Sequence, residues 1–261
     1  MLTKLKQLDD FTLRAGGEEI GRVRDVYFDD REWQTRYFVV QTGAWLKRRD
    51  VLIGPEAFQS LDREHRALAV NLSPDQVRHS PEVDTQKPVS RQREMELRTY
   101  YGWPAYWGSI YTEGVVPPVS AAIPPTVAET RAQEALANRS TAQEGDPHLR
   151  SARELTGYHV EATDGAIGHI EDLIVDDVGW AIRYLLIDTK NWLPGRKVIV
   201  APHWAREISW ETTRVYVDLT REAVRASPEF DDAVMTQSDY IDRLHDHYGR
   251  ERYVDRPLRR P

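Results

Sequence analysis

The chain has 261 residues, 40% of them hydrophobic and 30% charged, which is close to the globular average and fits one large domain or two modest ones. Its formal net charge of -7 comes from 35 basic and 42 acidic residues scattered along the sequence. This disfavours nucleic-acid binding, which needs a basic stripe. The absence of cysteine excludes disulfides, thiolate metal sites and a cysteine nucleophile.

The N-terminal region gives no sign of targeting. Residues 1–8 contain no continuous apolar core of signal-peptide length, and no stretch approaches the roughly 18 apolar residues that cross a bilayer. We therefore expect a soluble, cytoplasmic protein.

Short β-type runs dominate the first hundred residues. They are rich in Val, Ile, Tyr, Phe and Trp at a period close to two, and turn residues separate them. The pattern predicts strands at about 18–29, 34–42, 49–54, 57–62 and 67–72. Short strands at this spacing are typical of a small barrel or sandwich.

Helices and then a linker are predicted after these strands. Ser73 is a helix N-cap ahead of Pro74, and a last helix at about 90–101 ends at Gly102, which can adopt the left-handed C-cap conformation. Polyproline-like pieces around Pro117 and Pro124 then indicate a linker that is partly ordered at best.

The rest of the chain repeats the first part at an offset of 147 residues. Ile20-Gly21 reappears as Ile167-Gly168, and residues 4–107 align with 151–254 without a gap, at 29 identities in 104 pairs. Many other pairs exchange one apolar residue for another, as a shared core requires. The repeat predicts a helix that starts at Thr220 and a last helix at about 236–248 that ends at Gly249. The predicted domains are a first repeat at 1–107, a Pro/Ala-rich linker at 108–150, a second repeat at 151–254 and a basic tail at 255–261.

Both copies carry one ordered set of motifs, from Ile20 to Pro55 and from Ile167 to Pro202. Each set has an Ile-Gly strand that leads to Asp, an acidic turn, an apolar strand, and a Trp-Leu pair ahead of Val and Pro. This order and spacing resembles the PRC-barrel family. The resemblance implies a mainly β fold: two small PRC-type β-barrels with short helices, arranged as a pseudo-twofold tandem repeat.

The resemblance also implies a function. The family includes the cytoplasmic domain of the photosynthetic reaction-centre H subunit and a domain of a ribosome-maturation factor, whose barrels bind other macromolecules. We therefore expect a non-enzymatic binding or assembly module that needs no cofactor and has a protein partner, for which a membrane complex is one option. The two repeats are expected to form an intramolecular pseudo-dimer. The alternatives are an RNA or ribosome-maturation accessory factor and, with less support, a metal-dependent hydrolase.

Eight aromatic and basic side chains are candidates for the interaction surface, because amphipathic rings and guanidinium groups are favoured at interfaces. They are Trp45, Arg48, Arg49, Trp103, Tyr106, Trp107, Trp192 and Arg196. In the alternative interpretation Trp45 and Trp192 plug their own barrels, and the basic loop at residues 47–49 is merely solvated. The aromatic tail after Gly102 then wraps onto a barrel and joins the two modules.

Metal and acid–base chemistry finds little support in the sequence. The pairs Asp29-Asp30 and Asp176-Asp177 lie at turns, where carboxylates commonly bond to their own backbone. His245 and His247 point about 200° apart on a helix, so they cannot share one ion. We expect no catalytic residue and no metal site.

Two charged pairs recur in both copies. Asp25 with Arg36, and Asp172 with Arg183, are expected to form ion pairs that hold local geometry within each module.

Overall fold

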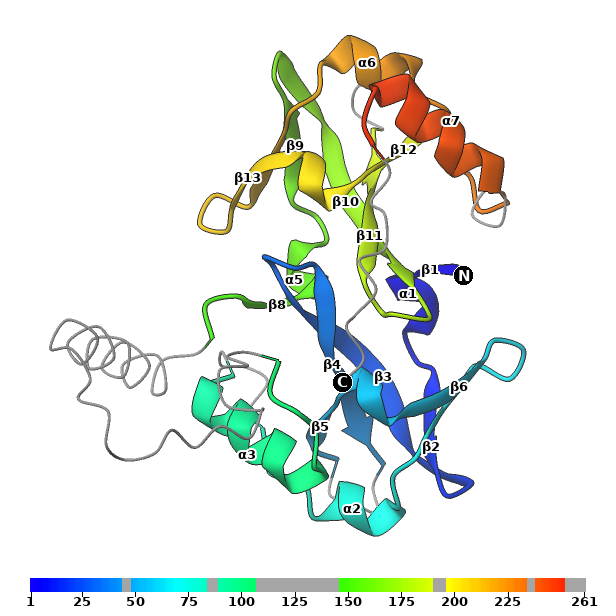
Figure 1. Ribbon diagram of the computed structural model, residues 1–261, viewed down its shortest axis with the longest axis vertical. Coiled ribbons are helices and arrows are strands. Elements are labelled where there is room, and N and C mark those ends of the chain that lie inside the picture. Colours follow the sequence, from blue (N-terminus) through cyan, green and yellow to red (C-terminus); the bar gives the residue numbers. More distant parts are fainter. Residues whose placement is uncertain (44–47, 84–88, 107–145, 190–195, 234–237, 252–261) are drawn as a thin grey trace, which may run out of the picture. The chain divides into compact units, whose positions relative to one another are not determined.

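The computed structural model describes residues 1–43, 48–83, 89–106, 146–189, 196–233 and 238–251, and its strands form two seven-stranded sheets (Figure 1). The first half contains β2 (Thr12–Ala15), β3 (Glu18–Asp29), β4 (Gln34–Thr42), β5 (Asp50–Ile53), β6 (Phe58–Asp62) and β7 (Ala67–Val70). Their hydrogen-bonded order is β5-β4-β3-β2-β7-β6, and β2 and β7 run parallel. Each predicted strand is present, within two residues of its predicted bounds.

The second half repeats this arrangement. Its strands are β9 (His159–Ala162), β10 (Gly165–Asp176), β11 (Ile182–Asp188), β12 (Lys197–Val200), β13 (Ala205–Ser209) and β14 (Arg214–Val217), in the order β12-β11-β10-β9-β14-β13. Apart from the one-residue differences at the ends of β4 and β11, the strand bounds coincide when 147 is added. The fold is thus mainly β with short helices, as predicted, and the strand paths end at β5 and β6 and at β12 and β13.

Four helices lie where the sequence predicts them, after Ser73, at about 90–101, after Thr220 and at about 236–248, whereas the one-turn helices that end at Leu8 and Leu155 were not predicted. They are α1 (Leu5–Leu8), α2 (Pro74–Arg78), α3 (Arg91–Tyr101), α5 (Ala152–Leu155), α6 (Arg221–Ala226) and α7 (Ser238–Tyr248), with 3-10 turns η2 (Pro55–Ala57) and η3 (Pro202–Trp204). Ser73 and Gln76 form a capping box, while Gly102 and Gly249 end α3 and α7 at φ values of 73° and 59°. No helix in the described part of the chain is long and apolar enough to span a bilayer.

Helix α3 covers one face of β4. Successive side chains of a strand point to opposite faces, so alternate residues of β4 face the helix. Tyr37 and Val39 are buried in one apolar cluster with Leu97 of α3. Phe38 is directed to the other face, where its ring centroid lies 4.7 Å from that of Phe58. Both faces of this strand are therefore buried, and α3 is held over the Tyr37 side.

Two three-residue strands have no signal in the sequence. β1 (Leu2–Lys4) pairs antiparallel with β10, where Thr3 lies opposite Val175, and β8 (Leu149–Ser151) pairs with β3. The segment that leads into the first copy thus adds a strand to the sheet of the second copy. The segment that leads into the second copy adds one to the sheet of the first.

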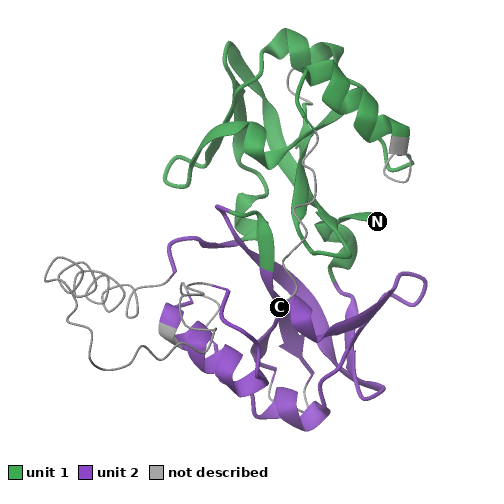
Figure 2. Ribbon diagram, viewed as in Figure 1, with its two compact units in different colours: residues 1–9, 32–35, 151–261 green, residues 10–31, 36–150 purple. Residues whose placement is uncertain are grey.

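The chain divides into two compact units that reflect this exchange (Figure 2). Unit 1 consists of residues 1–9, 32–35 and 151–261, and unit 2 of residues 10–31 and 36–150. Residues 1–9 therefore belong with the second copy. Residues 146–150, which lie within the predicted linker, belong with the first.

Candidate functional site

Five of the eight candidate interaction residues can be placed, since Trp45, Trp107 and Trp192 lie outside the described residues. Arg48 is exposed and adopts a positive φ of 49°. Its backbone N–H donates to the carbonyl of Gly43 at 3.3 Å. The Arg48 side chain therefore lies on the surface, as the solvated-loop interpretation also expects.

Arg49 and Arg196 bind the ends of short helices in their own halves. The Arg49 guanidinium donates to the carbonyls of Val77 (3.0 Å) and Ser80 (3.0 Å), where α2 ends. Arg196, 147 positions later, donates to the carbonyl of Ser227. Val77 lies in the last turn of α2, whose carbonyls have no intrahelical partner, and Ser80 and Ser227 lie just after their helices.

The aromatic tail after α3 packs on its own unit. Trp103 stacks on Tyr101, with centroids 4.3 Å apart and planes 18° apart. Tyr100 remains 39% exposed, although its hydroxyl donates to the carbonyl of Gln76 at 2.8 Å. We call the residues Tyr100, Tyr101 and Trp103 the aromatic ledge.

A buried polar network lies between α3 and β4. Glu94 of α3 is 0% exposed, and its Oε2 accepts hydrogen bonds from the hydroxyls of Tyr37 (3.0 Å) and Tyr106 (2.5 Å). One carboxylate oxygen therefore joins the sheet, the helix and the aromatic tail.

Arg98 extends the network toward the tail. Its Nε donates to the Tyr37 hydroxyl at 3.0 Å, and its Nη1 donates to Glu56 Oε1 (2.9 Å) and to the carbonyl of Pro104 (2.6 Å). The guanidinium carbons of Arg36 and Arg98 lie 3.9 Å and 4.6 Å from the centroid of the Tyr106 ring, within the range of a cation–π interaction. Tyr106 is thus packed onto its own half of the chain.

Arg91 carries the network to the chain beyond residue 145. Its Nη2 lies 2.7 Å from Asp146 Oδ2, and its Nη1 lies 3.6 Å from Glu94 Oε1. The N–H of Asp146 donates to the carbonyl of Val89 at 2.9 Å. Tyr106 and Asp146, the described residues on either side of 107–145, are therefore both bound to α3.

Burial sets the protonation state of this network. It raises the pKa of Glu94 to about 7, against the lowering effects of the Tyr106 hydrogen bond and the Arg91 charge. Burial and the Glu94 charge also raise the pKa values of Tyr37 and Tyr106. The two phenols therefore act as hydrogen-bond donors.

The second half replaces the ionic network with an aromatic cluster. Ile241 stands at the position of Glu94 and His245 at that of Arg98. The Tyr184 hydroxyl lies 3.1 Å from His245 Nε2, and the ring of Trp204 lies 5.2 Å from the His245 ring. The copies thus share a backbone but not the chemistry beneath the last helix.

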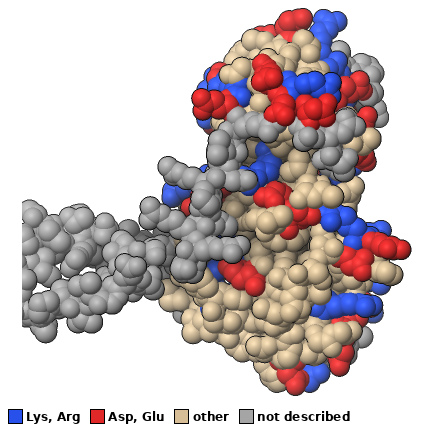
Figure 3. Space-filling view, turned by 45° about the vertical axis from the view of Figure 1, so that its right-hand side comes forward, with Lys and Arg blue, Asp and Glu red and all other residues tan. Residues whose placement is uncertain are grey.

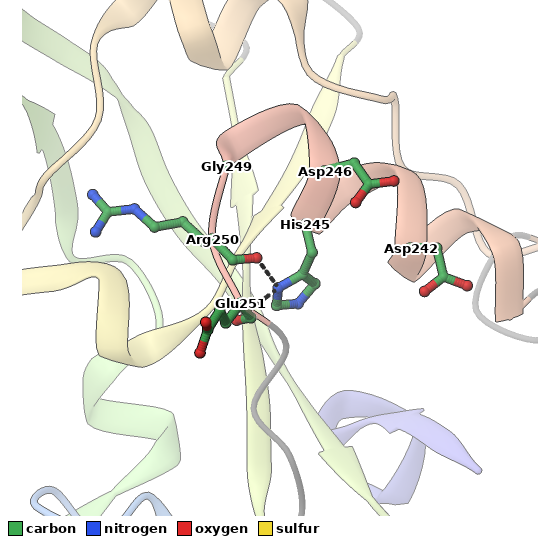
Figure 4. Close-up of a pocket in the computed structure, with 6 residues that line it drawn as sticks. All are labelled: Asp242, His245, Asp246, Gly249, Arg250 and Glu251. Atoms are coloured by element: carbon green, nitrogen blue, oxygen red, sulfur yellow. Dashed lines mark hydrogen bonds between the residues drawn. The ribbon is translucent and has the colours of Figure 1, made fainter.

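A shallow depression of about 470 Å³ lies at the C-terminal end of α7 (Figure 4). It is lined by Asp242, His245, Asp246, Gly249, Arg250 and Glu251. His245 Nδ1 faces the backbone carbonyls of Arg250 and Glu251, at 3.2 Å each, whereas the two aspartates point away from the imidazole. The carboxylates and the imidazole therefore do not converge on one reacting atom.

The acidic turns bond to their own backbone. Asp29 Oδ1 accepts the N–H of Arg31 at 2.9 Å, and Asp176 Oδ1 accepts those of Val178 (2.9 Å) and Gly179 (3.2 Å). In the described ranges no group of three or more His, Cys, Asp or Glu side chains is placed to hold a metal ion.

The predicted ion pair between Asp172 and Arg183 is wrong. Asp172 Oδ1 accepts the N–H groups of Lys6 (3.2 Å) and Leu173 (2.8 Å), while Arg183 Nη2 lies 3.0 Å from Asp176 Oδ2. The physical reason is that the Asp172 carboxylate accepts the backbone N–H of Lys6, in the N-terminal segment that packs on β10, and so does not pair with Arg183. In the first copy Arg36 Nη2 likewise lies 3.7 Å from Asp29 Oδ2.

Charged side chains of both signs are interspersed on the face drawn in Figure 3. The surface shown there has no continuous basic stripe of the kind that tracks a phosphate backbone.

Residues 13–77 match the PRC-barrel domain family, and this range spans β3 to β7 and most of α2 in the first half. No curated protein sequence matches the chain significantly.

Proposed function

We propose that this chain is a non-enzymatic binding or assembly module built from two PRC-type barrels, one in each half. The match over residues 13–77 supports the assignment of the first half. The second half is included because its sheet has the same strand order at an offset of 147 residues. By this proposal the module is of the reaction-centre H-subunit type and acts through its surfaces.

The observation that carries the proposal is that the chain uses its buried ionisable groups internally. Glu94 and Arg98 hold α3 and the tail on the sheet, and Arg49 holds the end of α2. Side chains that form internal hydrogen bonds of this kind stabilise a rigid scaffold and are not exposed to bind a substrate. The main recognition chemistry therefore lies on the surface.

We assign the docking surface of the first half to the aromatic ledge. Tyr100 and Trp103 are partly exposed there, and large rings with a polar tip favour protein interfaces. The second half carries His247 and Arg250 at the equivalent positions. The two copies are therefore proposed to bind different surfaces, and the occupant of the ledge is a protein.

We further propose that the two barrels form an intramolecular pseudo-dimer. The support is topological, because each sheet takes its additional strand from the segment that leads into the other copy. Such reciprocal exchange is the pattern expected of equivalent protomers that swap an identical element.

Affinity purification of the tagged full-length chain with cross-linking mass spectrometry tests the docking proposal. The double variant Tyr100→His/Trp103→Arg installs the residues that the second copy carries. Val178→Ser changes another exposed apolar side chain (83% exposed) and is the matched control. We expect a protein cross-linked near α3 to be retained by the wild type and the control and lost by the double variant.

Two results would contradict this function. Equal retention by the double variant would remove the ledge as the docking surface. Recovery of nuclease-sensitive RNA alone, released by moderate salt, would favour an RNA or ribosome-maturation role instead.

A further inference from the structure

We propose that Glu94 is a proton-operated latch that holds Tyr106 and Asp146 on helix α3, closed while the carboxyl group carries a proton and loosened when it ionises. This inference rests on the network in unit 2 and is independent of the proposed docking function.

The two carboxylate oxygens of Glu94 have different surroundings. Oε2 accepts both tyrosine hydroxyls, whereas Oε1 accepts no hydrogen bond from the residues that the structure describes. A proton can therefore bind Oε1 while Oε2 keeps both of its hydrogen bonds. The protonated form preserves the contacts and removes a buried charge.

Each of the three arginines around this network is paired with an acidic residue other than Glu94. Arg91 lies 2.7 Å from Asp146 but 3.6 Å from Glu94. Arg98 pairs with Glu56 of η2 at 2.9 Å. The third guanidinium, that of Arg36 on β4, pairs with Asp29 at 3.7 Å.

The remaining groups that face Glu94 do not compensate its charge. Tyr37 comes from β4 and Tyr106 from the tail, and both are neutral donors. Asp146, from the chain after residue 145, adds a like charge that raises the pKa of Glu94 further. Glu94 therefore shares its counterion, Arg91, with the closer carboxylate of Asp146, and burial favours the neutral form of Glu94.

Opening of the latch would expose Glu94 to water and return its pKa from about 7 toward the ordinary value of 4.5. Between these values the closed state binds the proton and the open state releases it. The stabilisation is complete below pH 4.5 and is lost as the pH rises through 7. The opening equilibrium constant should increase by up to about tenfold per pH unit in this window.

Opening affects two chain positions together. Tyr106 is held by Glu94 directly, and Asp146 is held by Arg91, which Glu94 also faces. When the carboxyl group ionises, the aromatic tail and the chain around Asp146 should loosen as one unit.

Hydrogen exchange of the full-length chain, corrected for intrinsic rates, tests the latch between pH 5 and 8. The reporters are the amides of Trp103 and Asp146, which donate to the carbonyls of Arg98 (2.8 Å) and Val89 (2.9 Å). In the wild type we expect opening to increase up to about tenfold per pH unit and to level off above pH 7. Glu94→Gln should show little opening at every pH, because a neutral amide oxygen still accepts both hydroxyls.

The matched control is Glu96→Gln on the same helix, where the carboxylate forms an exposed pair with Arg93 at 2.6 Å. It should behave as the wild type. Opening that does not depend on pH in the wild type, or that keeps its pH dependence in Glu94→Gln, would overturn the proposal. If that variant fails to fold, carbon NMR of the wild-type Glu94 carboxyl decides the question: a midpoint near 7 is expected, and one near 4.5 contradicts the latch.

Discussion

The guanidinium of Arg49 donates to the backbone carbonyl of Ser80 at 3.0 Å, and Arg196 makes the equivalent bond to Ser227. A second donor of Arg49 reaches the carbonyl of Arg78 at 2.7 Å. Arg49→Ala leaves these carbonyls without their charged donor, so we expect the free energy of unfolding to fall by about 1–3 kcal/mol. Urea denaturation of the full chain measures this loss.

The neighbouring side chain supplies the control for this prediction. Arg48 is exposed, and Arg48→Gln should change the free energy of unfolding by no more than about 0.5 kcal/mol. Arg49→Lys should restore only part of the loss, because an ammonium group lacks the planar fork that reaches several carbonyls. Equal effects at both positions would show that Arg49 has no special structural role.

The glycine of the Ile-Gly motif is required by close backbone packing. A Cβ atom on Gly21 would lie 2.3 Å from the carbonyl oxygen of Gln41, and one on Gly168 would lie 2.0 Å from that of Asp188. Gly21→Ala and Gly168→Ala should each destabilise the fold by about 1–3 kcal/mol. The Gly168 variant should lose more, because its φ of 151° also disfavours a side chain.

Gly179→Ala provides a matched comparison for these two variants. The nearest atom to a Cβ there would be Asp176 Oδ2 at 3.2 Å, a side-chain atom that is further away than the backbone atoms at Gly21 and Gly168. Thermal unfolding should place this variant closest to the wild type, and a larger loss at Gly179 than at Gly21 would contradict the packing argument.

Most of the fold could be predicted because the sequence signals for its strands and helix ends are local and occur in both copies. The alternation along β3 and β4, the Ser73 cap and the terminal Gly102 each leave a short-range signal. β1 and β8 could not be predicted in this way. Each has only three residues, too few to show a period, and each pairs with a strand more than a hundred positions away.

The buried network was missed because charged residues on a helix normally indicate a solvated face. A signal did exist in the repeat itself. Glu94 aligns with Ile241, an apolar residue at the same helix position, and the next turn aligns Arg98 with His245. A charged residue that replaces an apolar one in an otherwise equivalent helix marks a buried ionic site.

Asp172 should make stability depend on pH. Burial raises its pKa to about 6, although the N–H groups of Leu173 and Lys6 bind the charged form. Because the folded-state pKa lies above the ordinary value of 3.8, this stabilisation is present at low pH and is lost as the pH rises through 6. Asp172→Asn should remove this contribution.

Urea denaturation of the wild type and Asp172→Asn between pH 4 and 7.5 tests this sign. The difference in free energy of unfolding should shift in favour of the variant by at most about 1.4 kcal/mol per pH unit and become constant above pH 7. A shift in favour of the wild type would mean that hydrogen bonding outweighs burial at this carboxylate.

Because residues 1–9 belong to unit 1, we expect a substitution there to destabilise the second copy rather than the first. Leu8 of α1 is 1% exposed and belongs to unit 1, where α1 contacts β10. Leu8→Ala should cost about 2–5 kcal/mol through the lost burial and the cavity. Hydrogen exchange should quicken in β10 and remain unchanged in β3.

The exposed Lys6 on the same helix supplies the control variant Lys6→Ala. Faster exchange in β3 rather than β10 would show that residues 1–9 stabilise their own copy, because a cavity loosens first the strands that line it.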